Sequence, residues 1–382
     1  MTIYQHLPRI AVTVLFFVFG GISASWASRI PTIKDYMQVN DAAWGFVLLY
    51  IAVGTLLTLP IASWIIKQLG SKKATLIFLI CYLLLLVGIG YWNVLWQLKI
   101  NLIAFGAISN ITNISINTQA LHVAKKYKGQ IIGSFHGTWS IGGFIASWIG
   151  AEMISNYVPP LSHFVGFSTI GIIISILMYR FLILDKPIKS EEEQQKTGFI
   201  MPDKNLVTLG ILSFFALLAE GTMTDWASEY MKHIVKSPTE LIGYGLTAYM
   251  FTMATGRFVS DYTVKHFGAK TTLTISGILI FLGLILSVIH PTVYTTIFAF
   301  MIVGFGISAI VPMVYNLAGK SKVMPPQQAL TLITSIGFIG FFLGPPVIGF
   351  VAQAYSLTVA FAVIACFGLV ITLLSRITDY TE

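Results

Sequence analysis

Long apolar stretches separated by short polar ones fill almost the whole chain. A helix of about 20 apolar residues spans a bilayer core roughly 30 Å thick. Twelve stretches of this kind can be delimited, at residues 10–28, 42–66, 74–96, 98–121, 130–151, 161–183, 205–228, 240–262, 272–289, 292–318, 327–353 and 356–375. The pattern predicts an all-α membrane protein with twelve transmembrane helices.

The second half of the pattern repeats the first. Trp26-Ala27-Ser28 recurs two hundred positions later as Trp226-Ala227-Ser228. The same offset pairs glycines with glycines, namely Gly21 with Gly221, Gly45 with Gly245, Gly106 with Gly306 and Gly137 with Gly337. Many carriers are built from duplicated helix bundles. The repeat therefore predicts two pseudo-symmetric bundles of six helices, and with them a transport function.

One segment interrupts the apolar pattern. Residues 185–204 carry three consecutive glutamates and four lysines, with almost no bulky apolar side chain, which is typical of a solvated linker. We expect an N-terminal six-helix bundle over 1–184, a cytoplasmic linker over 185–204 and a C-terminal six-helix bundle over 205–382. Six spans return the chain to its starting side, so the halves are parallel copies.

Composition and charge agree with a membrane protein. Of 382 residues, 56% are hydrophobic and only 10% are charged, against roughly 25% in a soluble domain. The net charge of +8 does not indicate nucleic-acid binding, because the basic residues lie in short loops between spans. A cytoplasmic N-terminus puts eighteen lysines and arginines inside and five outside. This predicts a multi-pass protein of the bacterial inner membrane with both termini in the cytoplasm.

The first apolar stretch also has features of a signal peptide. Residues 10–27 are apolar, and Ala24 and Ala27 stand where a cleavage site would need small residues. The repeat favours an uncleaved helix, because the same Trp-Ala-Ser closes the seventh span deep in the chain. Cys81 and Cys366 both lie in apolar spans, where they are more simply small hydrophobic residues than a disulfide.

Two short basic turns occupy corresponding places in the two halves. Residues 67–72 follow the second span and residues 265–270 follow the eighth, and they are centred on Gly70 and Gly268. Glycine suits a tight turn between antiparallel helices because it accepts positive φ. Twelve spans in two halves, the charged linker and these two turns together resemble the major facilitator superfamily of secondary carriers. The resemblance covers essentially the entire chain.

At finer grain, two motifs resemble the MosC-like subgroup of that superfamily. They are residues 135–140, Phe-His-Gly-Thr-Trp-Ser, on the fifth span and Gly256-Arg257 followed by Asp261 on the eighth. The chain departs from the loop signature of the superfamily, in which an acidic residue precedes the turn glycine by three positions, because Lys67 and Lys265 stand there. Asp261 is a substitute acid in the second half only, so a symmetric cytoplasmic latch is not expected.

Charged side chains in the hydrocarbon core cost at least a few kcal/mol, so each one needs a reason. Glu220 lies about 22 Å along the seventh span, just past the membrane centre. A carboxyl group removed from water takes up a proton more readily, so we expect Glu220 to carry the coupling proton and Asp225 to assist. The alternatives are a neutral Glu220 bonded to a neighbouring helix and an interfacial Asp225 facing water or Arg29. Gly20 and Ser25 occupy the corresponding places in the first half.

Arg257 and Asp261 stand one helical turn apart on the eighth span, a spacing that allows an ion pair. Counted from the start of that predicted span, Arg257 lies close to the cytoplasmic surface. The resemblance to the superfamily implies a role in closing the inner side. We expect both residues to act in gating and packing rather than in solute binding.

The fourth span carries a stripe of amides. Asn110, Asn113 and Asn117 recur at i, i+3 and i+7, which places them on one helical face. They face either a watery cavity, where they bind a solute, or another helix, where each bond is worth about 0.6 to 2 kcal/mol. We favour the cavity. The resemblance implies that the fourth and tenth spans line it, so that Tyr315 and Asn316 face it as well.

Four further residues are candidates for contact with solute. His136 lies well inside a span, with Trp139 on the same turn. The histidine is either a proton relay or solute ligand, or a structural residue bonded to a backbone carbonyl. Trp26 and Trp226 lie near the predicted outer interface, where aromatic belts are ordinary. Stacking on the solute is their alternative role.

No pair of cysteines or histidines has metal-ligand spacing and no phosphate-binding loop occurs, so the sequence predicts no enzyme, metal site or cofactor. It predicts a monomeric symporter of a small polar organic solute, sugar-like and driven by H⁺, with Na⁺ as the alternative ion. The carrier is expected to work in the lipid bilayer by alternating access. The competing functions are a proton-driven exporter of amphipathic compounds and a membrane sensor that keeps this fold without transporting.

Overall fold

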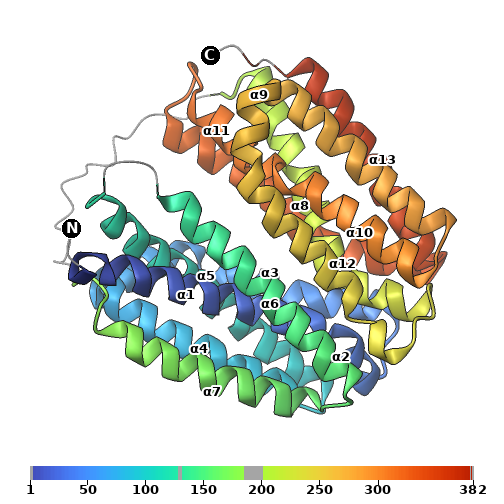
Figure 1. Cartoon of the computed structure of the whole chain (residues 1–382), viewed down its shortest axis with the longest axis horizontal. Coiled ribbons are helices and arrows are strands. Elements are labelled where there is room, and N and C mark those ends of the chain that lie inside the picture. Colours follow the sequence, from blue (N-terminus) through green and yellow to red (C-terminus); the bar gives the residue numbers. More distant parts are fainter. Residues whose placement is uncertain (1–2, 128–130, 185–200, 379, 381–382) are drawn as a thin grey trace. The chain divides into compact units, whose positions relative to one another are not determined.

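The computed structural model describes residues 3–127, 131–184, 201–378 and 380. The described residues form long helices joined by short connections, without a strand among them. Internal contacts divide the chain into two compact units, one comprising Met1–Val39 and Val47–Glu192, the other Asn40–Phe46 and Glu193–Glu382. Each unit is a helical bundle (Figure 1). Most of the predicted linker, 185–204, lies outside the described residues, so its exact limits stay a prediction.

The helices of the first half are α1 (Ile3–Ser28), α2 (Ile30–Met37), α3 (Asp41–Leu69), α4 (Ser71–Tyr91), α5 (Leu95–Ala124), α6 (Ile132–Ser155) and α7 (Pro160–Tyr179). Helix α1 packs along α6, and α4 packs against both α5 and α7. Glycine permits close approach between α1 and α6. A Cβ added at Gly142 on α6 would lie 2.1 Å from the carbonyl oxygen of Phe17 on α1.

The helices of the second half are α8 (Lys204–His233), the 3-10 turn η1 (Thr239–Leu241), α9 (Tyr244–Ile289), α10 (Val293–Ser308), α11 (Ile310–Gly319), α12 (Pro326–Ala354) and α13 (Leu357–Ile377). Helix α8 packs along α12 as α1 packs along α6, and α9 packs against α10 and α13 as α4 packs against α5 and α7. The repeat in the sequence is therefore a repeat of helix packing.

Glycines make the turns after the second long helix of each half. Gly268 divides α9 into two arms, because its φ of 79° and ψ of 161° are not helical. Gly70 stands at the N-terminal cap of α4 with φ 77°. Among the described residues these are the glycines with positive φ. The prediction that the two basic turns need glycine for its backbone freedom is confirmed.

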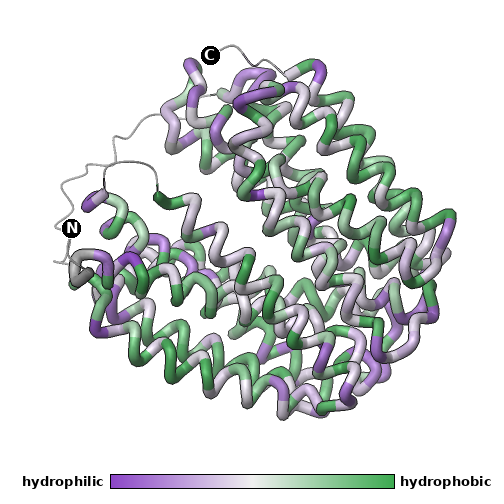
Figure 2. The backbone as a smooth tube through the Cα atoms, in the orientation of Figure 1, coloured by the Kyte–Doolittle hydropathy of each residue, from purple (hydrophilic) through white to green (hydrophobic). Residues whose placement is uncertain are grey.

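Nine helical stretches in the described part of the chain are long and apolar enough to cross a membrane. Figure 2 shows hydrophobic residues along the bodies of the helices and hydrophilic residues gathered near their ends. Three further long stretches, α5, α6 and the first arm of α9, are not among the nine. With them the count would reach the twelve spans that the sequence predicts, and that number stays a prediction.

Candidate functional site

The connection between α8 and α9 brings two charged residues of the second half to the same depth. Glu220 lies thirteen positions before His233, where α8 ends, and Arg257 lies thirteen positions after Tyr244, where α9 begins. At 1.5 Å of rise per residue, each is about 20 Å from its end of the connection. Two antiparallel helices joined in this way can place the two side chains opposite each other.

The two side chains form an ion pair. A guanidinium nitrogen of Arg257, Nη2, lies 3.2 Å from Oε1 of Glu220, and the side chains are 19% and 13% exposed, respectively. Arg257 donates a hydrogen bond across this distance. Charges withdrawn from water in a membrane protein are expensive unless they are paired. The pair therefore explains how α8 and α9 each tolerate a charge at this depth.

Two tyrosines lie near the Glu220–Arg257 pair. Tyr249 on α9 and Tyr315 on α11 both lie within electrostatic range of the Glu220 carboxylate. The Tyr249 hydroxyl is buried and donates to the sulfur of Met253 at 3.3 Å. One acid, one base and two phenol groups thus come from three helices of one bundle. Glu220, Arg257 and Tyr315 were predicted site residues, whereas Tyr249 was not predicted from the sequence.

Arg257 lies farther from the predicted cytoplasmic surface than the sequence suggests. That depth was counted from residue 240, whereas η1 and a turn occupy residues 239–243 and α9 begins only at Tyr244. The later start moves Arg257 away from the predicted cytoplasmic surface, into contact with Glu220. Asp261 lies on α9 one turn further, but its side chain is outside the described ones. Its predicted contact with Arg257 stays a prediction.

Asp225 does not join this pair. It follows Glu220 by five positions on α8, which turns it onto a different face of the helix, and its side chain is partly buried. No described ion pair includes it. A role for Asp225 beside Glu220 therefore stays a prediction.

The first half has no room for an acid in the place of Glu220. A Cβ added at Gly20 would lie 2.1 Å from the carbonyl oxygen of Trp139, so α1 and α6 touch there through their backbones. Ser25, in the place of Asp225, is completely buried. The asymmetry of charge between the two copies thus has a packing reason, because the first copy uses this position for close helix contact.

The predicted amide stripe on α5 divides into two parts. Asn110 donates to the hydroxyl of Thr58 on α3 at 3.1 Å, which is a bond between helices. Asn117 donates to the side-chain oxygen of Asn113 at 2.8 Å, and Asn113 is exposed. Exposed amides on a membrane helix need water or another polar partner. Asn113 is thus the exposed member of the stripe, and the half-buried Asn117 is bonded to it.

The remaining predicted contact residues fall into exposed and buried groups. His136 on α6 is exposed, with its ring edge-on to Phe16 at a centroid distance of 5.4 Å, and Trp139 beside it is partly buried. Trp26 and Trp226 are both buried within their own bundles. Their equivalent burial supports a packing role for the repeated Trp-Ala-Ser motif.

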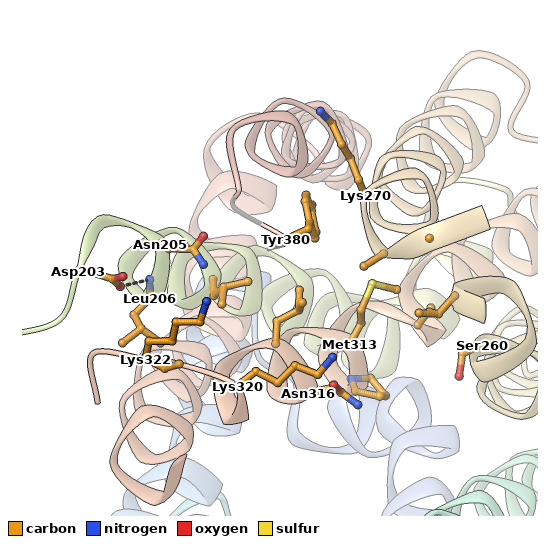
Figure 3. A pocket seen from close by; sticks show the side chains of 18 of the residues that line it. Asp203, Asn205, Leu206, Ser260, Lys270, Met313, Asn316, Lys320, Lys322 and Tyr380 are labelled. Carbon is orange, nitrogen blue, oxygen red and sulfur yellow. Dashed lines mark hydrogen bonds between the residues drawn. The ribbon is translucent and has the colours of Figure 1, made fainter. Parts of the chain in front are cut away.

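The two residues predicted on the tenth span point to different surroundings. Tyr315 lies close to Ser213 and Thr334 as well as to Glu220. Asn316, the next residue, is exposed and lines a cavity of about 730 Å³ at one end of the second bundle (Figure 3). Only Tyr315 therefore belongs with the ion pair.

The sequence analysis singles out none of the buried charges Arg29, Lys34 and Glu229 as a site residue, and two of them, Arg29 and Glu229, directly follow the Trp-Ala-Ser copies. Glu229 is completely buried and pairs with His233 at 3.4 Å; the i, i+4 spacing was a usable signal, missed because the seventh span was ended at residue 228. Arg29 was counted as a loop residue, but it is buried and donates to the carbonyl oxygen of Val158. Burial lowers the pKa of Arg29 to about 10.

The chain matches the family model described as Major Facilitator Superfamily. The match is made twice, over residues 11–224 and residues 209–381. The two matches together cover nearly the whole chain and overlap at residues 209–224, within the first helix of the second half.

Relatives of known name agree with the family model. An uncharacterized MFS-type transporter of Yersinia pestis is 29% identical over 368 residues, covering 96% of this chain and 95% of the relative. The membrane protein MosC of Rhizobium meliloti is 26% identical over 378 residues, covering 98% of this chain and 91% of the relative.

Solved transporters share the fold. A mutant of the nucleoside transporter NupG superimposes with a TM-score of 0.75 at 16% identity, covering 96% of this chain and 99% of its own. A bacterial homolog to the human lysosomal transporter Spinster, inward-facing and unoccupied, gives 0.77 at 14% identity, covering 99% and 98%. At such identities the likeness is one of fold.

Proposed function

Because the chain belongs to the Major Facilitator Superfamily, we propose that it is a proton-coupled secondary transporter of a small polar organic solute. The family and the named transporters among its relatives make it a multi-pass membrane carrier and point away from an enzyme. The proposal adds the coupling ion, the class of solute and the residues that act on them.

The observation that carries the proposal is the ion pair of Glu220 with Arg257. A carboxylate facing a guanidinium at 3.2 Å is neutralised as long as the carboxyl group is deprotonated. Proton uptake by Glu220 removes its charge and leaves Arg257 without this partner. Because an unpaired charge in this setting is costly, the two protonation states of Glu220 favour different arrangements of α8 and α9.

A carrier can use such a switch to couple two fluxes. The proton enters Glu220, the pair opens, and Arg257 becomes available to an oxygen atom of the solute or to a tyrosine hydroxyl. Tyr249 and Tyr315 already lie within range of the pair and are the nearest candidates for that exchange. Return of the proton to water restores the ion pair. Only the interactions that differ between the two states can drive the change.

The exposed polar groups of the first bundle support a polar rather than an amphipathic solute. Asn113 and Asn117 already bond to each other, and together they retain donors and acceptors that hydroxyl groups can use. His136 is exposed on α6. An exporter of amphipathic compounds would be expected to present mainly apolar side chains at these positions. We therefore keep a sugar-like solute as the proposal.

The first experiment identifies a solute. Purified protein is screened by thermal unfolding against monosaccharides, polyols and nucleosides, because a bound solute raises Tm by mass action. A compound that raises Tm is then tested for counterflow in proteoliposomes. A sensor with this fold would bind the compound but give no counterflow.

The second experiment tests the coupling residue. With the solute so identified, Glu220→Gln is expected to lose solute-driven proton uptake and to retain solute counterflow, because the fixed neutral side chain permits exchange but carries no proton. Glu240→Gln, at an exposed acid in η1, is the matched control and is expected to behave like the unmodified protein. Undiminished proton uptake by Glu220→Gln would rule out Glu220 as the coupling acid.

A further inference from the structure

A cavity of about 730 Å³ opens at one end of the second bundle. Its walls come from the start of α8, the turn of α9 around Gly268, the last part of α11 and the segment that follows α11. Tyr380, just beyond α13, also lines it. This is the end that the sequence predicts to face the cytoplasm. Glu220 and Arg257 are not among its lining residues.

The lining of the cavity is strongly basic. Lys265, Lys270, Lys320 and Lys322 line it, and the acidic residue of the lining is Asp203. The Asp203 carboxylate is already engaged, because it accepts a hydrogen bond from the backbone nitrogen of Leu206 at 2.9 Å as the N-terminal cap of α8.

The lysines of the cavity lie on more than one wall. Figure 3 shows Lys320 and Lys322 on one side of the cavity and Tyr380 and Lys270 across from them. Among the residues that the structure describes, four lysines and one aspartate thus belong to the lining. The cavity therefore gathers lysines from two walls around one open space, where an anion can contact more than one lysine.

The corresponding space in the first half is filled by one side chain. Gln119 on α5 is completely buried. Its side-chain nitrogen donates to the hydroxyl of Ser71 at 2.6 Å and to the carbonyl oxygen of Ile183 at 2.9 Å, and its oxygen accepts from the Ile183 nitrogen at 3.0 Å. Gln119 thus ties the start of α4 to the segment after α7.

The second half lacks both parts of this plug. The offset of two hundred positions pairs Gln119 with Gly319, and the alignment of the two turn glycines pairs Ser71 with Ala269. A Cβ added at Gly319 would meet no atom within 4 Å. The two side chains that close this end of the first copy are therefore missing at the matching positions of the second copy, next to the cavity-lining residue Lys320.

The turn lysines of the two halves differ in the same way. Lys72 donates to the carbonyl oxygen of Leu182 at 3.0 Å and lies 4.9 Å from the centre of the Tyr179 ring. Its counterpart, Lys270, lines the cavity instead. In the first half the lysine bonds to the segment after α7, whereas in the second half Lys270 is exposed at the edge of the cavity.

We propose that this cavity binds a phosphate-bearing ligand at the predicted cytoplasmic end of the second bundle. Lysine ammonium groups are common phosphate binders, and the side-chain amide of Asn205 is also part of the lining. The volume is within the range of pockets that hold small organic molecules. The phosphate belongs either to a soluble compound or to the headgroup of an anionic lipid, whose attraction to basic segments is well known. This site is additional to the proposed transport function.

The test uses the full chain in phosphatidylcholine nanodiscs, with one measurement for each source. Binding of radiolabelled pyrophosphate reports a soluble ligand. Retention of phosphatidylglycerol from mixed nanodiscs, measured by native mass spectrometry, reports a lipid. Saturable binding in either measurement is expected, and its absence from both would overturn the proposal.

Three variants show whether the binding belongs to the cavity. Lys320→Gln combined with Lys322→Gln is expected to weaken binding about tenfold or more, because two charge-assisted contacts are removed. Gly319→Gln, which restores the plug of the first half, is expected to weaken it as much without removing a charge. Lys73→Gln, at an exposed lysine of the first-half turn, is the control and is expected to bind normally.

Two results would contradict the assignment to this cavity. They are normal binding by folded Gly319→Gln and an equal loss in Lys73→Gln. If Gly319→Gln does not fold, the double lysine variant carries the test, with Lys320→Arg and Lys322→Arg together expected to restore binding because the charge is kept.

Discussion

At the scale of single residues, the chain places charges where their partners make them tolerable. Glu220 and Arg257 lie on adjacent helices and meet at 3.2 Å, and Glu229 meets His233 one turn away on α8. Each charge costs free energy when it is withdrawn from water, and pairing offsets part of that cost. Removing one partner should therefore be worse than removing both.

Arg257→Gln alone is expected to lower the free energy of unfolding by on the order of 2 kcal/mol, less than for a fully buried pair because both side chains are slightly exposed. The double variant with Glu220→Gln should recover most of that loss. Thermal unfolding in detergent at pH 7 measures both, and a double-mutant cycle isolates the pair. Strict additivity of the two single effects would show that the ion pair does not stabilise the bundle.

A second prediction at this scale concerns Gly20. Because a Cβ there would lie 2.1 Å from a backbone oxygen, Gly20→Ala is expected to separate α1 from α6 and to lower stability by about 1 to 3 kcal/mol. Gly166→Ala is the matched control on α7, where an added Cβ meets no atom within 4 Å. Equal Tm values for the two variants would contradict the close backbone contact.

At the scale of elements, the turns and helix ends decide where the functional side chains lie. Helix α9 begins at Tyr244 rather than at residue 240 and turns at Gly268, so its first arm carries Arg257 to the level of Glu220. The break at Ala309 between α10 and α11 lies six residues before Tyr315, which approaches the same pair. These positions depend on where helices start and stop, which hydropathy alone does not fix.

The glycine turns give a prediction at this scale. Gly70→Ala and Gly268→Ala are each expected to cost about 1 to 3 kcal/mol, because positive φ combined with an extended ψ is a region that essentially only glycine adopts. Gly133→Ala on α6, where an added Cβ meets no atom within 4 Å, serves as the control. Unfolding midpoints in a common detergent compare the three variants, and a stabilising Gly268→Ala would contradict the strain argument.

At the scale of the whole molecule, the two halves share their helix packing but differ in the polar residues to which we assign functions. The pairs α1 with α6 and α8 with α12 pack in the same way, whereas the second half carries the ion pair of Glu220 with Arg257 and the basic cavity around Lys320. In the place of Glu220, the first half has Gly20 and a close backbone contact between α1 and α6. In the place of Gly319, it has the buried side chain of Gln119.

The membrane orientation is a prediction about the whole chain. In a variant without native cysteines, Tyr294→Cys is expected to react with a membrane-impermeant maleimide in intact cells. Tyr294 lies at the start of α10, and the distribution of basic residues predicts that the connection between α9 and α10 faces the outside. Lys265→Cys should react only after the cells are permeabilised. Both native side chains are exposed, so accessibility is comparable. The reverse labelling pattern would invert the proposed orientation.

Much of this protein can be predicted from its sequence, because membrane insertion and duplication leave periodic signals. Apolar stretches give the helices, the Trp-Ala-Ser repeat gives the two halves, and Gly70 and Gly268 give the turns. Glu220 could be singled out because an acid in an apolar span is costly. The partner of Glu220 could not be found in this way, since it depends on the register between two helices.

The sequence by itself determined the family, the helical fold, the repeat and the short list of charged residues, because each of these depends on composition or on spacing along one helix. Only the tertiary structure decided that Arg257 meets Glu220 and that Gly20 leaves no space for an acid. It also decided that the basic residues around Lys320 line a cavity, whereas the buried Gln119 closes the matching end of the first half. Such facts depend on which side chains face each other across neighbouring helices. If a helix starts a few residues earlier or later, every side chain on it is rotated about the helix axis and shifted along it.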